Sequence, residues 1–267
     1  MKPDKHLRSV AIALGLVAAI FGPATARADQ GNDRLTPLQR EIERQRQRLS
    51  SLEVEDRRDA LMRLGNLKRP DASRAAAAAL NDAAPIVRVT AMHAVRWLPP
   101  REAAALVIPL LSDKAEFVRR EAASVLGRTR DPSATPALIS ALADKKASVR
   151  GASAIALGEV GDDAAVQPLA NLLTGAKKKR SFEDEFVLRS AARSLGQIAN
   201  RAAVPSLIAA LENPANAPDT RREAAIALGA IGDASAMPAL QAALSSGEDP
   251  YLSQAARGAM RAIKSKN

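Results

Sequence analysis

Few residues of this chain carry the side chains from which enzymes build reactive sites. The sequence has no cysteine, one tyrosine and two histidines, of which His6 lies in a segment that we expect to be removed. That leaves His93, whereas a Ser-His-Asp triad or a His/Cys metal site needs several such residues at defined spacing. Neither the GxGxxG nor the phosphate-loop pattern occurs. We therefore expect no catalytic residue, no metal and no cofactor.

The chain repeats one unit of two helices. In Phe117–Asp144 a first helix, a tight turn at Asp131 and a second helix follow one another. The ten-residue block VRREAASVLG that opens this unit has counterparts along the chain, and their last residues are 65, 96, 127, 158, 196, 229 and 261. The differences between successive positions are 31, 31, 31, 38, 33 and 32. Self-similarity at this period is typical of a solenoid, in which each unit packs on its neighbours.

These blocks resemble the HEAT repeat family, most closely its short bacterial variety named after phycobilisome lyases. The matching features are V-R at the start of the first helix, A-x-x-A-L-G at its end, I-G-D at 231–233 and A-V-P-x-L-x-x-A-L at 203–211. The resemblance implies an all-α, right-handed α-α superhelix over residues 56–267, preceded by a leader helix. It also implies a scaffold that binds proteins, since such repeats mostly serve this role. They identify an architecture well and an activity hardly at all.

Residues 1–28 have the order of a secretory signal peptide. A basic start is followed by a 12-residue apolar run over 10–21 and by small residues up to Ala28. A membrane-spanning helix would need about 20 apolar residues. We expect cleavage after Ala28 and a periplasmic or secreted protein. The formal charge would then fall from +10 to +7, because four basic residues and one acidic residue are removed.

The remaining chain divides into a leader and the repeats. Over residues 29–55 a polar start precedes an amphipathic helix that caps the stack, with Thr36 and Gln39 as a capping box and an end near Ser51. Dimerisation or partner docking is the alternative role of this helix. The repeats are expected near 56–85, 86–116, 117–147, 148–185, 186–218 and 219–250, with a half-repeat at 251–267.

Three features recur at fixed places in the repeats. Glycine ends the ten-residue block at 65, 127, 158, 196 and 229, which predicts a close approach of another backbone; Arg96 and Arg261 break this pattern. Asp131, Asp162 and Asp233 are placed to cap the second helices. Aspartate precedes arginine by six positions in the pairs Asp82–Arg88, Asp113–Arg119 and Asp144–Arg150. Such pairs link neighbouring units in HEAT proteins, and we expect a ladder of them here, although Arg119 lies off the apolar face of its helix.

The wider spacing in the fourth repeat places about seven extra residues within Thr174–Glu185. We expect a projecting loop, which Phe182 alone could anchor. Its basic run would contact an acidic partner or remain solvated: Lys177, Lys178, Lys179 and Arg180.

The second helices are expected to line a low-charge groove that binds an extended peptide or a partner helix. Its predicted contact residues are Ser140, Asn171, Ser206 and Gln241. His93 and Trp97 lie four positions apart on a first helix and form a second predicted contact, because Trp is common at interface centres. The alternative is that Trp97 only covers a turn.

The sequence thus predicts an exported, non-catalytic scaffold for a protein or peptide of the cell envelope, with no membrane span in the mature chain. A basic HEAT-like nucleic-acid-binding protein is the alternative, but the groove lacks the Lys/Arg stripe that phosphate neutralisation requires. A bilin lyase or isomerase activity fits less well, because no set of polar or aromatic groups for a tetrapyrrole is evident.

Overall fold

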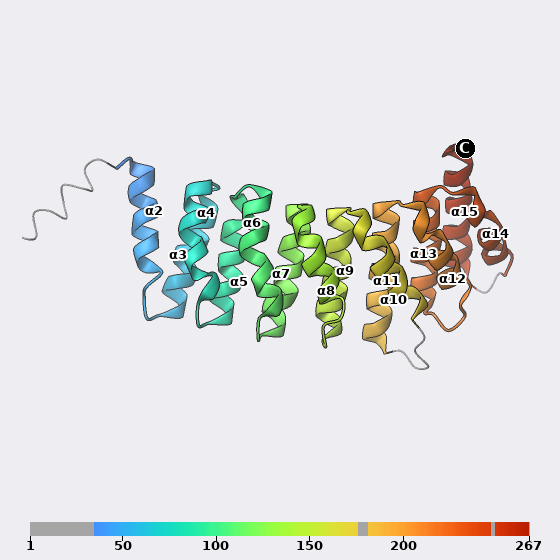
Figure 1. Cartoon of the computed structure of the whole chain (residues 1–267), viewed down its shortest axis with the longest axis horizontal. Coiled ribbons are helices and arrows are strands. Elements are labelled where there is room, and N and C mark those ends of the chain that lie inside the picture. Colours follow the sequence, from blue (N-terminus) through green and yellow to red (C-terminus); the bar gives the residue numbers. More distant parts are fainter. Residues whose placement is uncertain (1–34, 176–180, 247–248, 267) are drawn as a thin grey trace, which may run out of the picture. The chain divides into compact units, whose positions relative to one another are not determined.

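The computed structural model describes residues 35–175, 181–246 and 249–266, and all regular elements in these ranges are helices. The all-α solenoid fold is confirmed. The chain divides into one unit that ends at Arg44 and a larger unit from Gln45 onward. Figure 1 shows the larger unit as a succession of helix pairs. The predicted signal peptide lies outside the described residues.

Helix α2 (Pro37–Arg48) begins with the predicted capping box. The Gln39 backbone N–H donates to Thr36 Oγ1 (3.2 Å), and the Thr36 N–H donates to Gln39 Oε1 (2.9 Å). The helix ends three positions before Ser51, because the backbone there changes to hydrogen bonds between residues three apart. Its start is therefore as predicted and its end is earlier.

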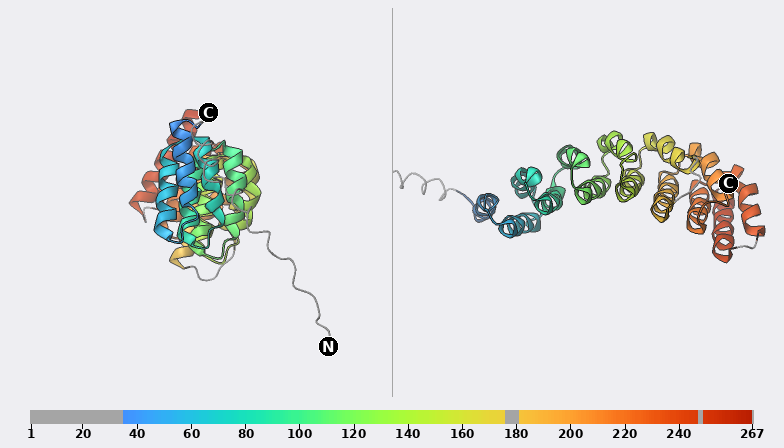
Figure 2. Two further views of the ribbon diagram at one scale, coloured as in Figure 1. Left: turned by 90° about the vertical axis from the view of Figure 1, so that its left-hand side faces the viewer. Right: turned by 90° about the horizontal axis from the view of Figure 1, so that it is seen from below.

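The larger unit contains two rows of helices, which the right-hand view of Figure 2 shows end-on. The first helices of the pairs are α3 (Val54–Asn66), α5 (Pro85–Ala94), α7 (Glu116–Thr129), α9 (Ala147–Val160), α11 (Phe182–Ile198), α13 (Pro218–Ile231) and α15 (Pro250–Lys266). The second helices are α4 (Pro70–Ala76) with η2 (Ala77–Asn81), α6 (Pro100–Val107) with η4 (Ile108–Ser112), α8 (Thr135–Ala141), α10 (Val166–Thr174), α12 (Val204–Glu212) and α14 (Met237–Ser245).

Leucine and alanine fill the core between the rows. The largest fully buried side chains are all leucine apart from Met92. Small and unbranched side chains suit this architecture, because each layer is only two helices deep and each helix must pack closely on its neighbours. This accounts for an aromatic content of 2%.

The predicted caps at the second helices are confirmed. Asp131, Asp162 and Asp233 each accept a hydrogen bond from the backbone N–H two positions later. Gly161 and Gly232 precede two of them with φ of 76° and 82°, in the left-handed region that favours glycine. Each cap precedes a single 3₁₀ turn: η5 (Pro132–Ala134), η6 (Asp163–Ala165) and η8 (Ala234–Ala236).

The glycines that end the first-helix blocks lie against the next first helix. A Cβ placed on Gly127 or Gly196 would be 2.8 Å from the Cα of Ala156 or Ala227, and one on Gly229 would be 2.7 Å from Ala259 Cα. The predicted close backbone approach is confirmed at these positions. At Gly158 the neighbours are instead the side chains of Gln197 and Ser194, and Ser194 Oγ would lie 2.6 Å from an added Cβ.

The second repeat departs from this pattern, as the sequence predicts. Arg96 stands where glycine is expected, and α5 ends at Ala94 in a 3₁₀ turn, η3 (Val95–Trp97). The preceding contact is also looser: a Cβ on Gly65 would lie 3.4 Å from the Cα of Ala94. Helices α3 and α5 therefore approach less closely at this level than the later first helices do.

The expected loop at Thr174–Glu185 is partly wrong. Residues 182–185 form the first turn of α11, whose capping box joins Ser181 and Asp184 through hydrogen bonds of 3.1 and 3.3 Å. Phe182 is 88% exposed, so it does not anchor the segment. The basic run at 177–180 lies outside the described residues. The acidic residues thus extend a helix, because they favour its positive N-terminal end.

The close glycine contacts predict opposite effects of one substitution at two sites. Gly196→Ala should lower the melting temperature, because the new methyl group forces α11 and α13 apart, at a cost of about 1–3 kcal/mol. Gly258→Ala in α15 meets nothing within 4 Å, and should raise it through the higher helix propensity of alanine, worth up to about 1 kcal/mol. Thermal unfolding followed by circular dichroism compares the two variants. Stabilisation by both would contradict the packing role of Gly196.

Candidate functional site

A ladder of buried ion pairs connects the first four repeats. Arg88 donates from Nε and Nη2 to the two carboxylate oxygens of Asp113, both at 2.7 Å. The same two-point contact joins Arg57 to Asp82 and Arg119 to Asp144. The side chains of Arg88 and Asp113 are only 7% and 8% exposed. Each arginine therefore ties its own first helix to the turn that leads into the next repeat.

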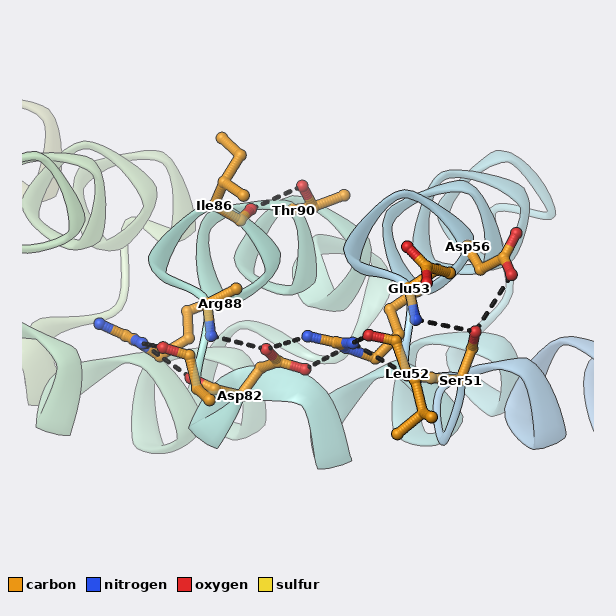
Figure 3. Close-up of polar contacts among 11 residues, drawn as sticks. Ser51, Leu52, Glu53, Asp56, Asp82, Ile86, Arg88 and Thr90 are labelled. Carbon is orange, nitrogen blue, oxygen red and sulfur yellow. Dashed lines mark hydrogen bonds and ion pairs between the residues drawn. The ribbon is translucent and has the colours of Figure 1, made fainter.

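The predicted pairing six positions apart exists, but through a different group. Arg88 Nη1 donates to the backbone carbonyl of Asp82 at 2.7 Å (Figure 3). The carboxylate of Asp82 is held by Arg57. Arg119 reaches the carbonyl of Asp113 in the same way, at 2.9 Å. The short sequence separation places each guanidinium beside its own turn, and the carboxylate of the following turn takes the remaining N–H groups. Arg119 is buried for this reason, although the sequence places it off the apolar face of its helix.

Each ladder aspartate also accepts a backbone hydrogen bond in the turn just before the following helix. The carboxylate of Asp113 accepts from the backbone N–H of Ala115 at 2.8 Å, and those of Asp82 and Asp144 do the same two positions on. Burial alone would raise the pKa of Asp113, but the hydrogen bonds from Arg88 and Ala115 outweigh it and hold the pKa below its usual value. The arginine hydrogen bond is the main cause of the lowered pKa of Asp144.

The ladder changes partner at the fourth repeat. Arg150 donates to Asp184, at 3.0 Å, from the first turn of α11. In the fifth repeat, the position that corresponds to this arginine is the buried Leu188. The acidic residues that the sequence analysis assigned to a loop therefore complete the fourth rung. The ladder is interrupted at the fifth repeat, and in the sixth the corresponding Arg221 donates to the backbone carbonyl of Leu211.

Two hollows lie side by side between second helices, next to the ladder turns. The first, of about 610 Å³, lies between η2 and the α6–η4 segment and is lined by Ala77, Leu80, Ala105 and Leu106 among others. The second, of about 420 Å³, lies between η4 and α8 and includes Ala137, Ser140 and Ala141. Pro109 and Ser112 line both. We call the two hollows together the second-helix groove.

The groove is bounded by neutral side chains over most of its surface. Ala105, Pro109, Ser112 and Ser140 are exposed along it. Asp113 borders the first hollow and Asp144 the second, but both carboxylates are held by arginine. The groove therefore offers apolar contact surface with the serine hydroxyl groups at its edge, and the exposed Lys114 lies on the first hollow.

Of the four predicted groove residues, Ser140 lies in the second hollow. The others lie on later second helices: Asn171 on α10, Ser206 on α12 and Gln241 on α14. None of the four is buried. They are spread along one row of helices rather than gathered in one pocket.

His93 and Trp97 lie elsewhere, at the end of α5 and in η3. Both line a separate recess of about 260 Å³ between α3 and α5. His93 is exposed and its Nε2 lies 3.3 Å from a carboxylate oxygen of Glu121 on α7. The recess also contains Lys68 and Arg96, which the sequence analysis did not select, although Arg96 was recognisable as a break in the glycine pattern.

The described residues hold no group of three or more His, Cys, Asp or Glu arranged to bind a metal ion. Within the same ranges, no helix combines the length and the apolar character needed to cross a membrane.

The family model described as HEAT repeats matches residues 104–181 and 180–261, more than half of the chain. The chain belongs to the HEAT-repeat family. No curated protein matches its sequence. The predicted resemblance to HEAT repeats is confirmed by this match.

Three solved structures are similar to this chain over most of its length. An engineered protein is 20% identical, with a TM-score of 0.50, over 84% of this chain and 68% of its own. The CpcE–CpcF complex of phycocyanin lyase from Nostoc is 24% identical, with a TM-score of 0.49, over 95% and 99%. Human deoxyhypusine hydroxylase in complex with glycerol is 19% identical, with a TM-score of 0.38, over 90% and 99%. At such low identity, the likeness to the engineered protein concerns the fold alone.

The ladder predicts a pH-dependent effect of one substitution. At neutral pH, Asp113→Asn should cost about 3 kcal/mol, because the buried charge of Arg88 loses its partner. A lowered pKa in the folded state gives stability that is present above the unfolded pKa, near 3.9, and is lost as the pH falls through the folded value. The cost of the substitution should therefore shrink below about pH 4. Urea unfolding at several pH values measures it.

Asp71→Asn is the control for that experiment. Asp71 is 67% exposed and forms an ion pair within α4 with Arg74, so its substitution should cost less than about 1 kcal/mol at every pH. A cost for Asp113→Asn that matches the control, or that stays constant down to acidic pH, would contradict the stabilising role of the ladder.

Proposed function

We propose that this chain is an exported HEAT-repeat scaffold that binds an extended peptide segment of a partner protein in the second-helix groove. The observation that carries the proposal is the pair of adjacent hollows on consecutive repeats, with Pro109 and Ser112 lining both. A small-molecule ligand would need one enclosed pocket. Two open hollows that follow the repeat suit a ligand that is itself repetitive.

The repeat spacing indicates the form of the ligand. Packed helices lie about 8–10 Å apart. An extended peptide in the polyproline II conformation advances about 3.1 Å per residue and points every third side chain in the same direction. Three residues of an extended chain therefore span one repeat. A peptide with an apolar side chain at every third position would place one such side chain in each hollow. The hydroxyl groups of Ser112 and Ser140 are exposed and would form hydrogen bonds with the peptide backbone.

The absence of catalysis is part of this proposal rather than a property of the fold, since proteins named as a hydroxylase and a lyase have HEAT-like structures. It is supported by the composition of the groove, whose carboxylates are held by arginine and are not available as acids or bases.

The groove is tested with a peptide library and charged variants of the protein. Peptides selected on the wild-type chain from a displayed random library should carry apolar residues three apart. Ala105→Glu with Ser140→Glu places one charge in each hollow at exposed positions. It should weaken the selected peptides about tenfold or more, because an unpaired carboxylate would be buried on binding. Binding is measured by fluorescence anisotropy of the labelled peptide.

Ile226→Glu with Gln254→Glu makes the same change of charge at exposed positions of first helices α13 and α15. This control should bind like the wild type. Equal losses in both double variants would show a general charge effect, and undiminished binding in the groove variant would place the ligand on another surface.

Export is tested independently. The basic start, the apolar run and the small residues before Ala28 support removal of residues 1–28. Amino-terminal sequencing of the protein from a secreting bacterial host should begin at Asp29. An uncut product retained in the cytoplasm would rule out the proposed location and leave the groove proposal standing.

A further inference from the structure

The recess between α3 and α5 is a second site with a different chemistry from the groove. Its apolar walls include Leu61, Met62 and Ala94, and one side is formed by Trp97. Its volume of about 260 Å³ is below the 300–1,000 Å³ or so of ordinary ligand pockets. It therefore suits a single small molecule or one side chain.

Two cations lie against the same aromatic ring at this recess. The guanidinium carbon of Arg96 is 4.6 Å from the centre of the Trp97 ring, and Lys68 Nζ is 5.7 Å from it. Both distances are within the range of cation–π contacts. Within residues 35–175, 181–246 and 249–266, neither cation has an acidic partner, unlike the ladder arginines. The two positive charges also repel each other, so an anion would stabilise both.

The sequence explains why no carboxylate neutralises them. In the third, fourth and sixth repeats an aspartate caps the 3₁₀ turn after the first helix. The first and second repeats have Arg69 and Pro99 at the corresponding caps. His93, which also lines the recess, already contacts Glu121, and Glu121 also pairs with Arg128.

The recess exists because the repeat is irregular at this point. Gly65 faces Ala94 at the loosest of the glycine–alanine contacts, and Arg96 replaces the glycine of its own block. The 3₁₀ turn η3 contains Trp97, whose ring lies against both Lys68 and Arg96. The departure from the repeat therefore creates both the space and the charge.

We propose that this recess binds a carboxylate attached to a small apolar body. Lys68 and Arg96 supply the donors that two carboxylate oxygens need, and the apolar body lies against the accessible side chains of Met62 and Trp97. A phosphate group fits less well, because the helix ends that meet here are carboxyl ends whose carbonyl groups repel negative charge, and phosphate carries more negative charge than a carboxylate. The site is independent of the peptide groove.

Trp97 reports directly on the site, because it is the one tryptophan of the chain. The experiment titrates the full chain with benzoate, with its neutral analogue benzamide and with inorganic phosphate, and follows tryptophan fluorescence. Benzoate should give a saturable change, whereas the other two should bind at least about tenfold more weakly. Lys68→Gln with Arg96→Gln should weaken benzoate binding about tenfold or more.

Lys145→Gln with Arg120→Gln removes the same charge at exposed positions outside the recess and should leave benzoate binding unchanged. Circular dichroism confirms that both double variants are folded. Cations at helix carboxyl ends also stabilise the helix dipole; if that were the whole role of Lys68 and Arg96, their replacement would lower the melting temperature and benzoate would not bind the wild type. Equal binding of benzamide, tighter binding of phosphate, or unchanged binding of benzoate by the Lys68/Arg96 variant would each overturn the proposal.

Discussion

The structure of the first four repeats depends on one interaction, the two-point contact between a buried guanidinium group and the carboxylate of the next turn. It is strong only because every hydrogen-bonding group is used. Arg88 satisfies Asp113 with two N–H groups and the carbonyl of Asp82 with a third, while Asp113 also accepts from the following helix. A buried ion pair with unsatisfied groups would cost more than it contributes. The ladder thus fixes where each turn lies, and the turns in turn border the groove.

Close packing of first helices is already present between Gly127 and Ala156 and continues where the ladder ends. Leu188 occupies the arginine position of the fifth repeat, and the tight contacts of Gly196 and Gly229 with alanine follow after it. The N-terminal repeats show the opposite combination, with complete ion pairs and a loose contact at Gly65. Both open features, the groove and the Trp97 recess, lie in the part held mainly by ion pairs. Polar links hold repeats together without requiring their helices to fill all the space between them.

Much of this was predictable from the sequence because it follows from local rules. The period, the helix pairs, the aspartate caps and the register glycines each depend on residue type at a fixed place. The choice of carboxylate for each arginine was not predictable, since an aspartate recurs both shortly before and well after each arginine, and only the stacking distinguishes the two. The helical start of α11 was missed because its acidic residues were read as part of a charged loop rather than as a capped first turn. The recess was missed because it arises where Arg96 replaces a register glycine. The replacement shows that the packing must differ there, but not which side chains line the resulting space.

The two contacts of each ladder arginine have a consequence for how such a chain can change in length. Arg88 follows the aspartate that it binds through the carbonyl, Asp82, and precedes the one that it binds through the carboxylate, Asp113, and these two aspartates are one full repeat apart. A tandem duplication or loss of one whole repeat among the first three would therefore pair an existing arginine with an existing aspartate and leave neither without its partner. Whole repeats in this half of the molecule can therefore be gained or lost without disrupting its ion pairs. The C-terminal half has repeats of unequal length and individually fitted helix contacts, so it would need a new interface for every unit gained.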